Sequence, residues 1–273
     1  MDYHLREDEY LGADGLVYCK HCRTPRTCYI AEVDKRFPIQ CECQKQAERK
    51  ERECQLLVER RTRVEAMRKN SSLGKNFFGC TFERSNVTAH NADLYALCKE
   101  YCNHAEEMLA NGYGVYLYGS TGVGKTHLTA CMGNALTDGL YSVFYTSFLE
   151  IESGLKSEFG NNTAQQRLIE KTESADFLFL DDLGTENLKA GSTTWMQSII
   201  FDIINRRYNA NKPIVCSSNY TLAQLMSECN YEQRTVHRLM EMCPLYRQLD
   251  CEIMRDSAAE QKRNNLMKIL GGN

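Results

Sequence analysis

Short apolar runs alternate with longer helical stretches in the part of the chain that follows residue 75. Runs rich in β-branched and aromatic residues predict four buried strands, at 115–118, 142–146, 177–180 and 213–217. Stretches with one apolar side predict helices before and between them, at 91–110, 125–138, 148–158, 163–173 and 193–209. Strands separated by helices favour a parallel sheet, so we expect an α/β core. After Thr221 the pattern predicts helices alone, at 222–228, 232–242 and about 257–270.

The first 74 residues follow a different pattern. Residues 19–43 hold five cysteines and too few apolar side chains to form a hydrophobic core. Residues 44–70 are rich in charge and contain neither glycine nor proline, which predicts an exposed helix supported by Glu and Arg at helical spacing. The segment Ser71-Ser-Leu-Gly74 ends that helix. We therefore place domain boundaries after residues 43 and 74.

Composition narrows the class of protein. Hydrophobic residues make up 42% of the chain and charged residues 25%, which is typical of soluble globular proteins. The net charge of −3 excludes a basic signature spread over the whole chain, so any nucleic-acid surface must be local. No run of 18 apolar residues occurs and the first residues are polar and acidic, so we expect a cytoplasmic protein without membrane contact. The 14 cysteines are then expected to be reduced thiols.

Two close pairs of cysteines suggest a metal site. Cys19-x-x-Cys22 is followed by Cys41-x-Cys43, and two thiolate pairs at this separation suit a tetrahedral zinc ion. A short segment with few apolar residues needs such a link to fold. The predicted zinc ligands are Cys19, Cys22, Cys41 and Cys43. Cys28 or His21 stays open as a substitute for one ligand, and unconnected free thiols are the alternative.

A phosphate-binding loop follows the predicted strand at 115–118. The pattern Gly-x-x-x-x-Gly-Lys-Thr begins at residue 119, and each residue type has a task. Glycines let backbone N–H groups converge on phosphate oxygens, and the next helix directs its positive dipole end to the same anion. A chance Gly/Ser-rich turn is disfavoured because a strand precedes the loop and a helix follows it. The predicted nucleotide-binding residues are Gly119, Ser120, Thr121, Gly122, Val123, Gly124, Lys125 and Thr126.

Polar residues that follow two other strands complete the predicted site. Asp181 and Asp182 end the strand at 177–180, which we expect to lie beside the phosphate loop. Asp181 is then suited to hold Mg²⁺ and Asp182 to polarise the attacking water. Asn219 ends the strand at 213–217 and can orient that water, although a strand-ending cap or turn is the alternative.

Four motifs, in this order, resemble those of the DnaC/DnaI-type bacterial and phage replicative helicase loaders. These loaders are AAA+ ATPases grouped with the IstB-type transposition helpers. The motifs are Gly-Val-Gly-Lys-Thr-His-Leu (122–128), Phe-Leu-Asp-Asp-Leu-Gly (179–184), Ile-Ile-Asn-Arg-Arg-Tyr (203–208) and Ser-Ser-Asn-Tyr (217–220). The resemblance covers about residues 77–255, and the cysteine cluster with the basic helix resembles the zinc-binding, helicase-contacting domain of the DnaI branch.

The resemblance implies a role for each matched residue. Lys125 and Thr126 would belong to Walker A, and Asp181 would be the Walker B ligand of Mg²⁺. Asn219 would be sensor 1. These roles agree with those inferred above from the phosphate-loop pattern and from the polar residues at the strand ends.

The arginine assignments rest on the resemblance. Arg238 would be the arginine finger and Arg255 the sensor 2 arginine, with Arg234 as an alternative for the finger; without the resemblance all three are ordinary surface charges. Two departures stand out. Asp182 replaces the Glu of many AAA+ proteins, which predicts slow, switch-like hydrolysis, and His237 replaces a small hydroxyl residue beside Arg238.

The function implied by the resemblance is ATP-dependent delivery of a hexameric replicative helicase onto single-stranded DNA, with ATP, Mg²⁺ and Zn²⁺ as cofactors. We expect a zinc-binding domain at 1–43, a charged linker at 44–74 and an ATPase domain at 75–273 that also assembles with its own copies. A transposition helper, or a zinc adaptor that uses ATP only as a latch, is the alternative. Candidates for DNA contact are Lys156, Lys189 and Arg206.

Overall fold

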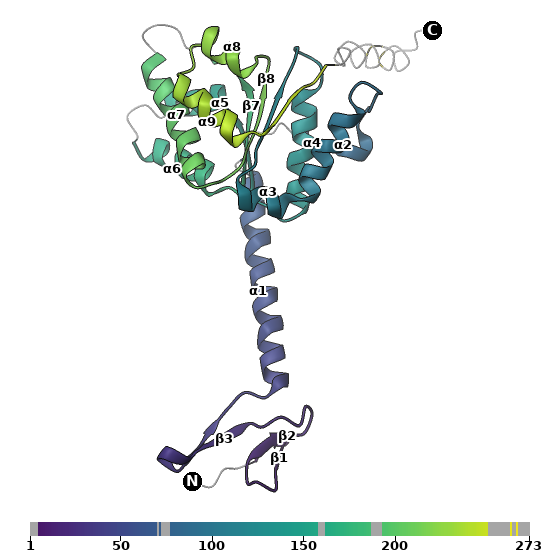
Figure 1. The fold of residues 1–273 in the computed structure, drawn as a ribbon, viewed down its shortest axis with the longest axis vertical. Coiled ribbons are helices and arrows are strands. Elements are labelled where there is room, and N and C mark those ends of the chain that lie inside the picture. Colours follow the sequence, from purple (N-terminus) through teal and green to yellow (C-terminus); the bar gives the residue numbers. More distant parts are fainter. Residues whose placement is uncertain are drawn as a thin grey trace. The chain divides into compact units, whose positions relative to one another are not determined.

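The chain forms two compact units that meet inside one helix. The computed structural model describes residues 5–69, 71, 77–157, 162–186 and 193–250, with Arg263 and Leu266. One unit comprises Met1–Arg61 and the other Thr62–Asn273 (Figure 1). The division falls within the predicted linker, because the last turns of its helix pack with the second unit. The helix predicted at 257–270 lies outside the described residues except for Arg263 and Leu266, which are both helical.

Two small antiparallel hairpins make up the start of the first unit. Strand β1 (Glu9–Leu11) pairs with β2 (Val17–Cys19), and β3 (Thr27–Ile30) pairs with β4 (Lys35–Pro38). A short 3-10 turn at Ala31–Val33 joins the second pair. The sequence pattern did not predict these strands. Each has only three or four residues, which is too short for apolar alternation to stand out.

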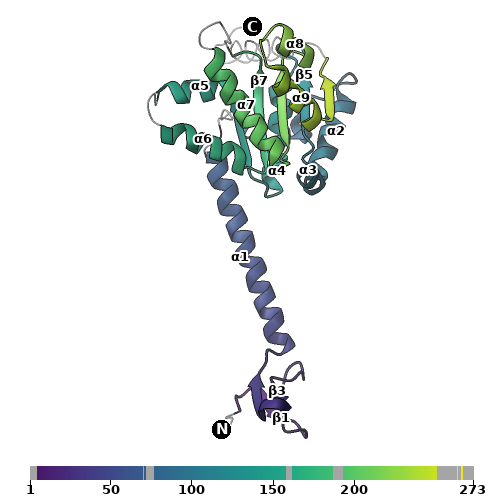
Figure 2. The same cartoon turned by 60° about the vertical axis from the view of Figure 1, so that its left-hand side comes forward.

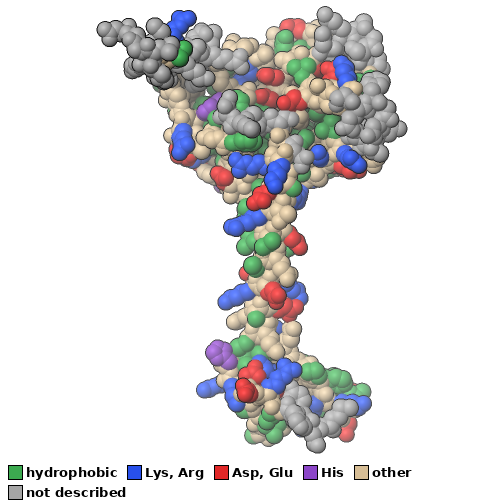
Figure 3. Space-filling model, turned by 180° about the vertical axis from the view of Figure 1, so that it is seen from behind, with side chains coloured by type: hydrophobic (Ala, Val, Ile, Leu, Met, Phe, Trp, Pro, Cys, Tyr) green, Lys and Arg blue, Asp and Glu red, His purple; other side chains and the backbone are tan. Residues whose placement is uncertain are grey.

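Helix α1 (Glu42–Lys69) confirms the predicted charged helix. Figure 3 shows basic and acidic side chains interspersed along it, as expected for a helix that faces solvent. Its last turns differ, because Val64 and Met67 are buried. Arg63 donates to the carbonyl oxygen of Ser174 at 2.6 Å and to Asp176 at 3.1 Å. The end of α1 therefore belongs structurally to the second unit.

The second unit is built on a five-stranded parallel sheet with the order β6-β7-β8-β5-β9 (Figure 2). The strands are β5 (Val115–Tyr118), β6 (Val143–Ser147), β7 (Phe177–Leu183), β8 (Ile214–Ser218) and β9 (Leu245–Gln248). The α/β class and the four predicted strands are confirmed.

One expectation about the sheet was wrong. β9 is a strand, although helices alone were expected after Thr221; its residues are half-buried or exposed and form no apolar run, so the pairing with β5 decides their conformation. The order of the strands places β8 between β7 and β5. The carboxylates of β7 therefore reach the phosphate loop across the carboxyl end of β8.

Helices cover both faces of the sheet. Figure 1 shows α5–α9 on one side and α2 and α4 on the other. The helices are α2 (Ala92–Asn103), α3 (Ala105–Asn111), α4 (Lys125–Asp138), α5 (Phe148–Ser157), α6 (Asn162–Ser174), α7 (Thr193–Asn209), α8 (Leu222–Ser227) and α9 (Gln233–Met242), with a 3-10 turn at Phe82–Arg84. The single helix predicted at 91–110 is divided at His104.

Alternate strand residues supply two separate apolar cores. Leu178 and Leu180 of β7 pack with α5 and α7, whereas Phe177 and Phe179 pack with α2 and α4. This alternation follows from the two-residue period of a strand. Because both faces are covered, the carboxyl edge of the sheet is where polar side chains gather. Among the described residues, no helix combines the length and apolar character needed to cross a bilayer.

Candidate active site and metal centre

The predicted phosphate loop joins β5 to α4. Gly122 and Gly124 have φ values of 89° and 98°, a conformation that glycine adopts without strain. Gly124 is the N-cap of α4 and has no side chain with which to cap the helix. The amides at the helix start are therefore placed to meet an external anion, with the helix dipole adding to the attraction.

Gly119 lets the end of β9 approach the loop closely. A Cβ at Gly119 would lie 2.3 Å from the carbonyl oxygen of Leu249, which leaves no room for a side chain. The Leu249 N–H donates to the carbonyl oxygen of Tyr118 at 2.7 Å. The strand that the sequence did not predict thus fixes the first residue of the phosphate loop.

Lys125 is held in place at the start of α4. It is 5% exposed, and its Nζ donates to the carbonyl oxygens of Gly119 and Ser120, both at 2.9 Å. The same Nζ donates to Oδ1 of Asn219 at 2.8 Å. These contacts bring Lys125 and Asn219, both predicted from the sequence as site residues, together at the carboxyl edge of the sheet.

The first carboxylate of β7 meets the hydroxyl that follows Lys125. Thr126 donates to Oδ1 of Asp181 at 3.3 Å, and the Ser217 hydroxyl donates to the same oxygen. A hydroxyl and a carboxylate are the oxygen ligands that Mg²⁺ takes in nucleotide sites. The donor set therefore fits a Mg²⁺ ion bound together with a nucleotide.

The second carboxylate lies at a backbone irregularity. Asp182 is exposed and has a φ of 53°, in the left-handed region that Asp tolerates better than most residues. Its N–H donates to the Ser217 hydroxyl at 3.1 Å. The strand thus carries its two carboxylates in different surroundings, Asp181 half-buried and Asp182 in solvent.

Two further side chains near the carboxylates show the effect of burial. Both oxygens of Glu186 accept from the Gly184 N–H at 3.2 Å, and burial raises the pKa of this carboxyl to about 7. The Tyr145 hydroxyl hydrogen-bonds to Thr129 at 2.8 Å, and burial raises the pKa of Tyr145 well above its usual range. Apolar patterning predicted that position 145 is buried, but it carried no signal that its hydroxyl faces the loop helix.

The candidate arginine fingers lie on α9 and pack against α7. Arg238 stacks over the rings of Phe201 at 4.6 Å and Tyr208 at 5.5 Å, and Arg234 stacks over Phe201 at 3.9 Å. Arg234 also pairs with Glu232. The structure therefore places both candidates on one aromatic surface, and Arg255 lies outside the described residues.

The three candidates for DNA contact differ in how far the structure describes them. Lys156 pairs with Glu152, and Arg206 pairs with Asp202 at 3.1 Å. Lys189 lies outside the described residues. Exposed pairs of this kind are weak and leave both cations accessible.

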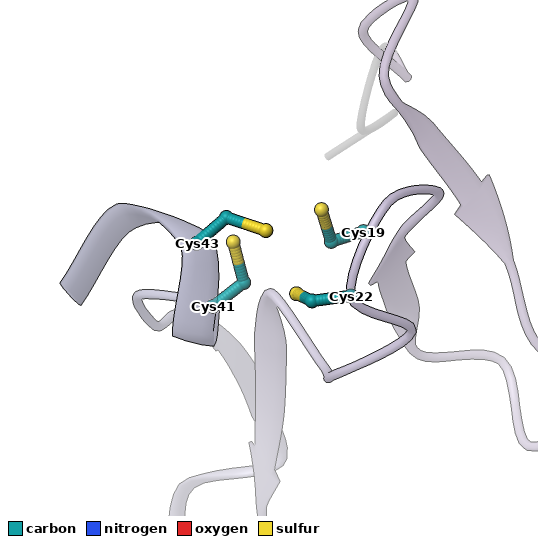
Figure 4. A group of neighbouring side chains, drawn as sticks. All are labelled: Cys19, Cys22, Cys41 and Cys43. Atoms are coloured by element: carbon teal, nitrogen blue, oxygen red, sulfur yellow. The ribbon is translucent and has the colours of Figure 1, made fainter. Parts of the chain in front are cut away.

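The four predicted metal ligands converge in the first unit. Figure 4 shows the sulfur atoms of the two cysteine pairs turned toward a common centre. All four Sγ atoms lie within 4.8 Å of one another. Four sulfurs at the ~2.3 Å bond length of tetrahedral zinc would be about 3.8 Å apart, so the cluster fits that ion. Among the described residues the cluster consists of Cys19, Cys22, Cys41 and Cys43; His21 and Cys28 are not members.

A buried arginine supports this cluster. Arg26 is 6% exposed and donates to Sγ of Cys19 at 3.6 Å. It also pairs with Asp8 at 2.6 Å and Glu9 at 3.0 Å. Four thiolates around a divalent ion carry two excess negative charges, and a guanidinium beside one sulfur offsets part of that charge. No sequence pattern distinguishes this buried arginine from the exposed ones.

Comparison with known proteins identifies the family of this chain. The model of the IstB-like ATP binding protein family matches residues 88–245, which include the phosphate loop, both carboxylates and Asn219. The chain belongs to the IstB-like ATP-binding family. Its parallel sheet, with the phosphate loop after β5, is the α/β P-loop fold expected from the sequence.

Several relatives of this IstB-like protein are helicase loaders. It is 25% identical to the replicative helicase loader DnaI of Bacillus subtilis over 65% of this chain and 56% of that protein. It is also 25% identical to the replicative helicase loader DnaC of Buchnera aphidicola, over 56% of this chain and 63% of that protein. The chain thus spans little more than half the length of these relatives. A crystal structure of the DnaC helicase loader shares the fold, with a TM-score of 0.52 and 24% identity over 64% of this chain and 98% of that one.

Proposed function

We propose that the protein is an ATP-dependent loader that delivers a hexameric replicative DNA helicase onto single-stranded DNA. The proposal rests on one observation: the chain contains both a nucleotide site and a separate cysteine cluster. An IstB-like ATP-binding core follows a separate unit built around four cysteines. Two relatives with the same kind of core are helicase loaders. A nucleotide site attached to a separate binding unit suits a switch that holds and then releases a partner.

Each residue at the carboxyl edge of the sheet has a proposed task. Lys125 and the loop amides bind the phosphates, and Thr126 with Asp181 holds Mg²⁺. Asp182 and Asn219 orient and polarise the attacking water. When bound, ATP with Mg²⁺ supplies the phosphoryl bond whose cleavage changes the state of the protein. The shorter carboxylate of Asp182 favours slow hydrolysis, because it reaches less far than the Glu usual at this position.

Two arginines are proposed to complete the site. Arg238 would reach the γ-phosphate of a neighbouring copy, and Arg255 would close over the nucleotide of its own copy. The stacking of Arg238 on Phe201 supports this role because a guanidinium laid on a ring is held in a defined direction. Arg234 shares the same ring and remains the alternative.

The first unit is proposed to bind the helicase. In the second hairpin of that unit every residue of β4 is exposed, and so are Tyr29 and Ile30 of β3. Exposed apolar and aromatic side chains on a small metal-bound unit are typical of a protein-binding surface. This surface supports binding of a partner at a site separate from the nucleotide site.

Affinity capture with candidate replicative helicases tests the proposal. Cys41→Ser should abolish capture because it removes a metal ligand, whereas Cys54→Ser should leave capture intact because Cys54 is an exposed residue of α1 outside the cluster. Equal capture by both variants would contradict the assignment of the first unit. Capture of a transposase in place of a helicase would favour the transposition helper.

A further inference from the structure

Strand β7 bulges where it carries its two carboxylates. Its register with β8 shifts between Leu180 and Leu183. As a result two residues of β7, Asp181 and Asp182, lie opposite one residue of β8, Ser217. A bulge of this kind takes one residue out of the regular hydrogen-bond ladder and redirects the side chains beside it.

Ser217 supplies the hydrogen bonds at this bulge. Its hydroxyl accepts the N–H of Asp182 at 3.1 Å and donates its proton to Oδ1 of Asp181. The residue is 0% exposed, so water does not compete for these contacts. A hydroxyl can donate once and accept at the same time, so the single oxygen of the Ser217 side chain serves both contacts.

The same hydroxyl therefore touches both residues to which the nucleotide chemistry is assigned. Asp182 holds a φ of 53°, a conformation that costs free energy for a residue other than glycine and persists only where its surroundings fix it. Asp181 must keep Oδ1 within reach of Thr126, now at 3.3 Å. The Ser217 hydroxyl fixes the left-handed conformation of Asp182 through its backbone N–H, and it fixes the position of Asp181 through its carboxylate.

We propose that Ser217 is a positioning residue for the Mg²⁺ ligand Asp181 and for the water-polarising Asp182. The inference rests on the proposed ATP hydrolysis and deepens it. Ser217 is assigned no contact of its own with the nucleotide or the ion; its hydroxyl contacts Asp181 and Asp182. It acts by holding the bulge, so that Asp181 faces Thr126 while the backbone of Asp182 stays left-handed.

A purely structural role makes a different prediction. If the hydroxyl served only to satisfy a buried N–H, its loss would lower the free energy of unfolding and leave the metal dependence of the site unchanged. If it positions Asp181, its loss must raise the Mg²⁺ concentration that the site requires. Outer-shell partners of metal ligands typically contribute about 10- to 100-fold in metal affinity or activity.

Ser218 offers a matched control on the same strand. It is also 0% exposed, and its hydroxyl donates to the carbonyl oxygen of Leu183 at 2.6 Å and accepts the Tyr220 N–H at 3.0 Å. Ser218→Ala therefore removes a buried hydroxyl with a similar number of contacts, none of them to a carboxylate. It should cost similar stability while leaving the Mg²⁺ requirement unaltered.

The test is a Mg²⁺ titration of fluorescent ATP-analogue binding, paired with steady-state ATP hydrolysis, on the full-length protein. Ser217→Ala should raise the half-saturating Mg²⁺ concentration about tenfold and lower kcat at least about tenfold, with thermal unfolding no worse than in Ser218→Ala. Ser217→Thr keeps the hydroxyl and should recover most of the Mg²⁺ affinity.

Two outcomes would overturn the inference. One is an identical Mg²⁺ requirement in Ser217→Ala and Ser218→Ala; the other is failure of Ser217→Thr to recover Mg²⁺ affinity although it folds. Failure of the proposed function is a separate result, since it would show as a wild-type protein that hydrolyses no more ATP than Lys125→Ala. The Mg²⁺ titration of nucleotide binding would still decide the role of Ser217 in that case.

Discussion

The two units of this protein are held together by different physical means. In the second unit, apolar side chains fill both faces of a five-stranded sheet. Within the described residues 5–61, the buried apolar side chains are Val17, Cys19 and Cys41, and two of these are predicted metal ligands. We therefore expect the first unit to depend on metal coordination, whereas the second depends on apolar burial.

This difference separates the two proposed tasks. If the first unit folds around a metal, it can present apolar residues such as Leu11 and Tyr29 to a partner, because it does not need them for its own core. The second unit keeps comparable residues inside and exposes polar groups at one edge of its sheet. Perturbing one unit should therefore leave the other folded, and variants in each unit test this independence.

The largest effect is expected from loss of a metal ligand. Cys41→Ser should unfold the first unit, since structural zinc sites contribute on the order of 10 kcal/mol to folding. Hydrogen exchange followed by mass spectrometry should show loss of protection in residues 5–41 and unchanged protection in residues 115–250. Slowed exchange retained in both regions would mean that the first unit does not depend on its metal.

The next effect contrasts the same substitution in the two units. Leu180→Ala removes a fully buried side chain from β7 and should lower the free energy of unfolding by about 3 kcal/mol. Leu11→Ala acts on a side chain that is 58% exposed and should change the free energy of unfolding by less than about 0.5 kcal/mol. Urea denaturation measures both. Similar losses would contradict the division between coordination and burial.

Removal of the loop lysine should act on ligand binding alone. Lys125→Ala deletes the charge that faces the phosphates and should weaken ATP binding at least about 100-fold, or about 2.7 kcal/mol. Isothermal titration calorimetry measures the affinity, and metal analysis should show an unchanged zinc content. A drop in zinc content would show that the units are not independent.

The smallest effect is a pH dependence set by Glu186. Burial raises the pKa of this carboxyl to about 7 in the folded protein, so its contribution to stability is fully present below about pH 4.5 and is lost as the pH rises through about 7. Denaturation of the wild type and Glu186→Gln between pH 5 and 8 should diverge by roughly 2 kcal/mol, with the wild type losing stability as the pH rises. Parallel curves would mean that Glu186 titrates normally.

The parts predicted from sequence are those with a local cause. The phosphate loop is a continuous pattern, and two residues separate Cys19 from Cys22 while one separates Cys41 from Cys43, so spacing alone indicates their chemistry. Strands such as β7 carry unbroken apolar runs. Local signals of this kind can be interpreted from the sequence because they do not depend on contacts with distant parts of the chain.

The parts that escaped prediction depend on distant partners. β9 becomes a strand only because β5 offers it an edge. Arg207 looks like a surface charge in the sequence, yet its side chain is fully buried. It donates to the carbonyl oxygens of Thr172 and Asp176, at and just beyond the end of α6, and burial lowers its pKa to about 9. The bulge at Asp182 likewise exists only through the register with β8.

The proposed function requires that ATP binding in one unit governs delivery of a helicase that is bound by the other. Its most direct test is the transfer of a hexameric replicative helicase onto circular single-stranded DNA, measured as DNA-bound helicase after gel filtration, with wild type and Lys125→Ala compared in ATP. We predict that both proteins bind the helicase and that only the wild type transfers it. Undiminished transfer by Lys125→Ala would contradict the claim.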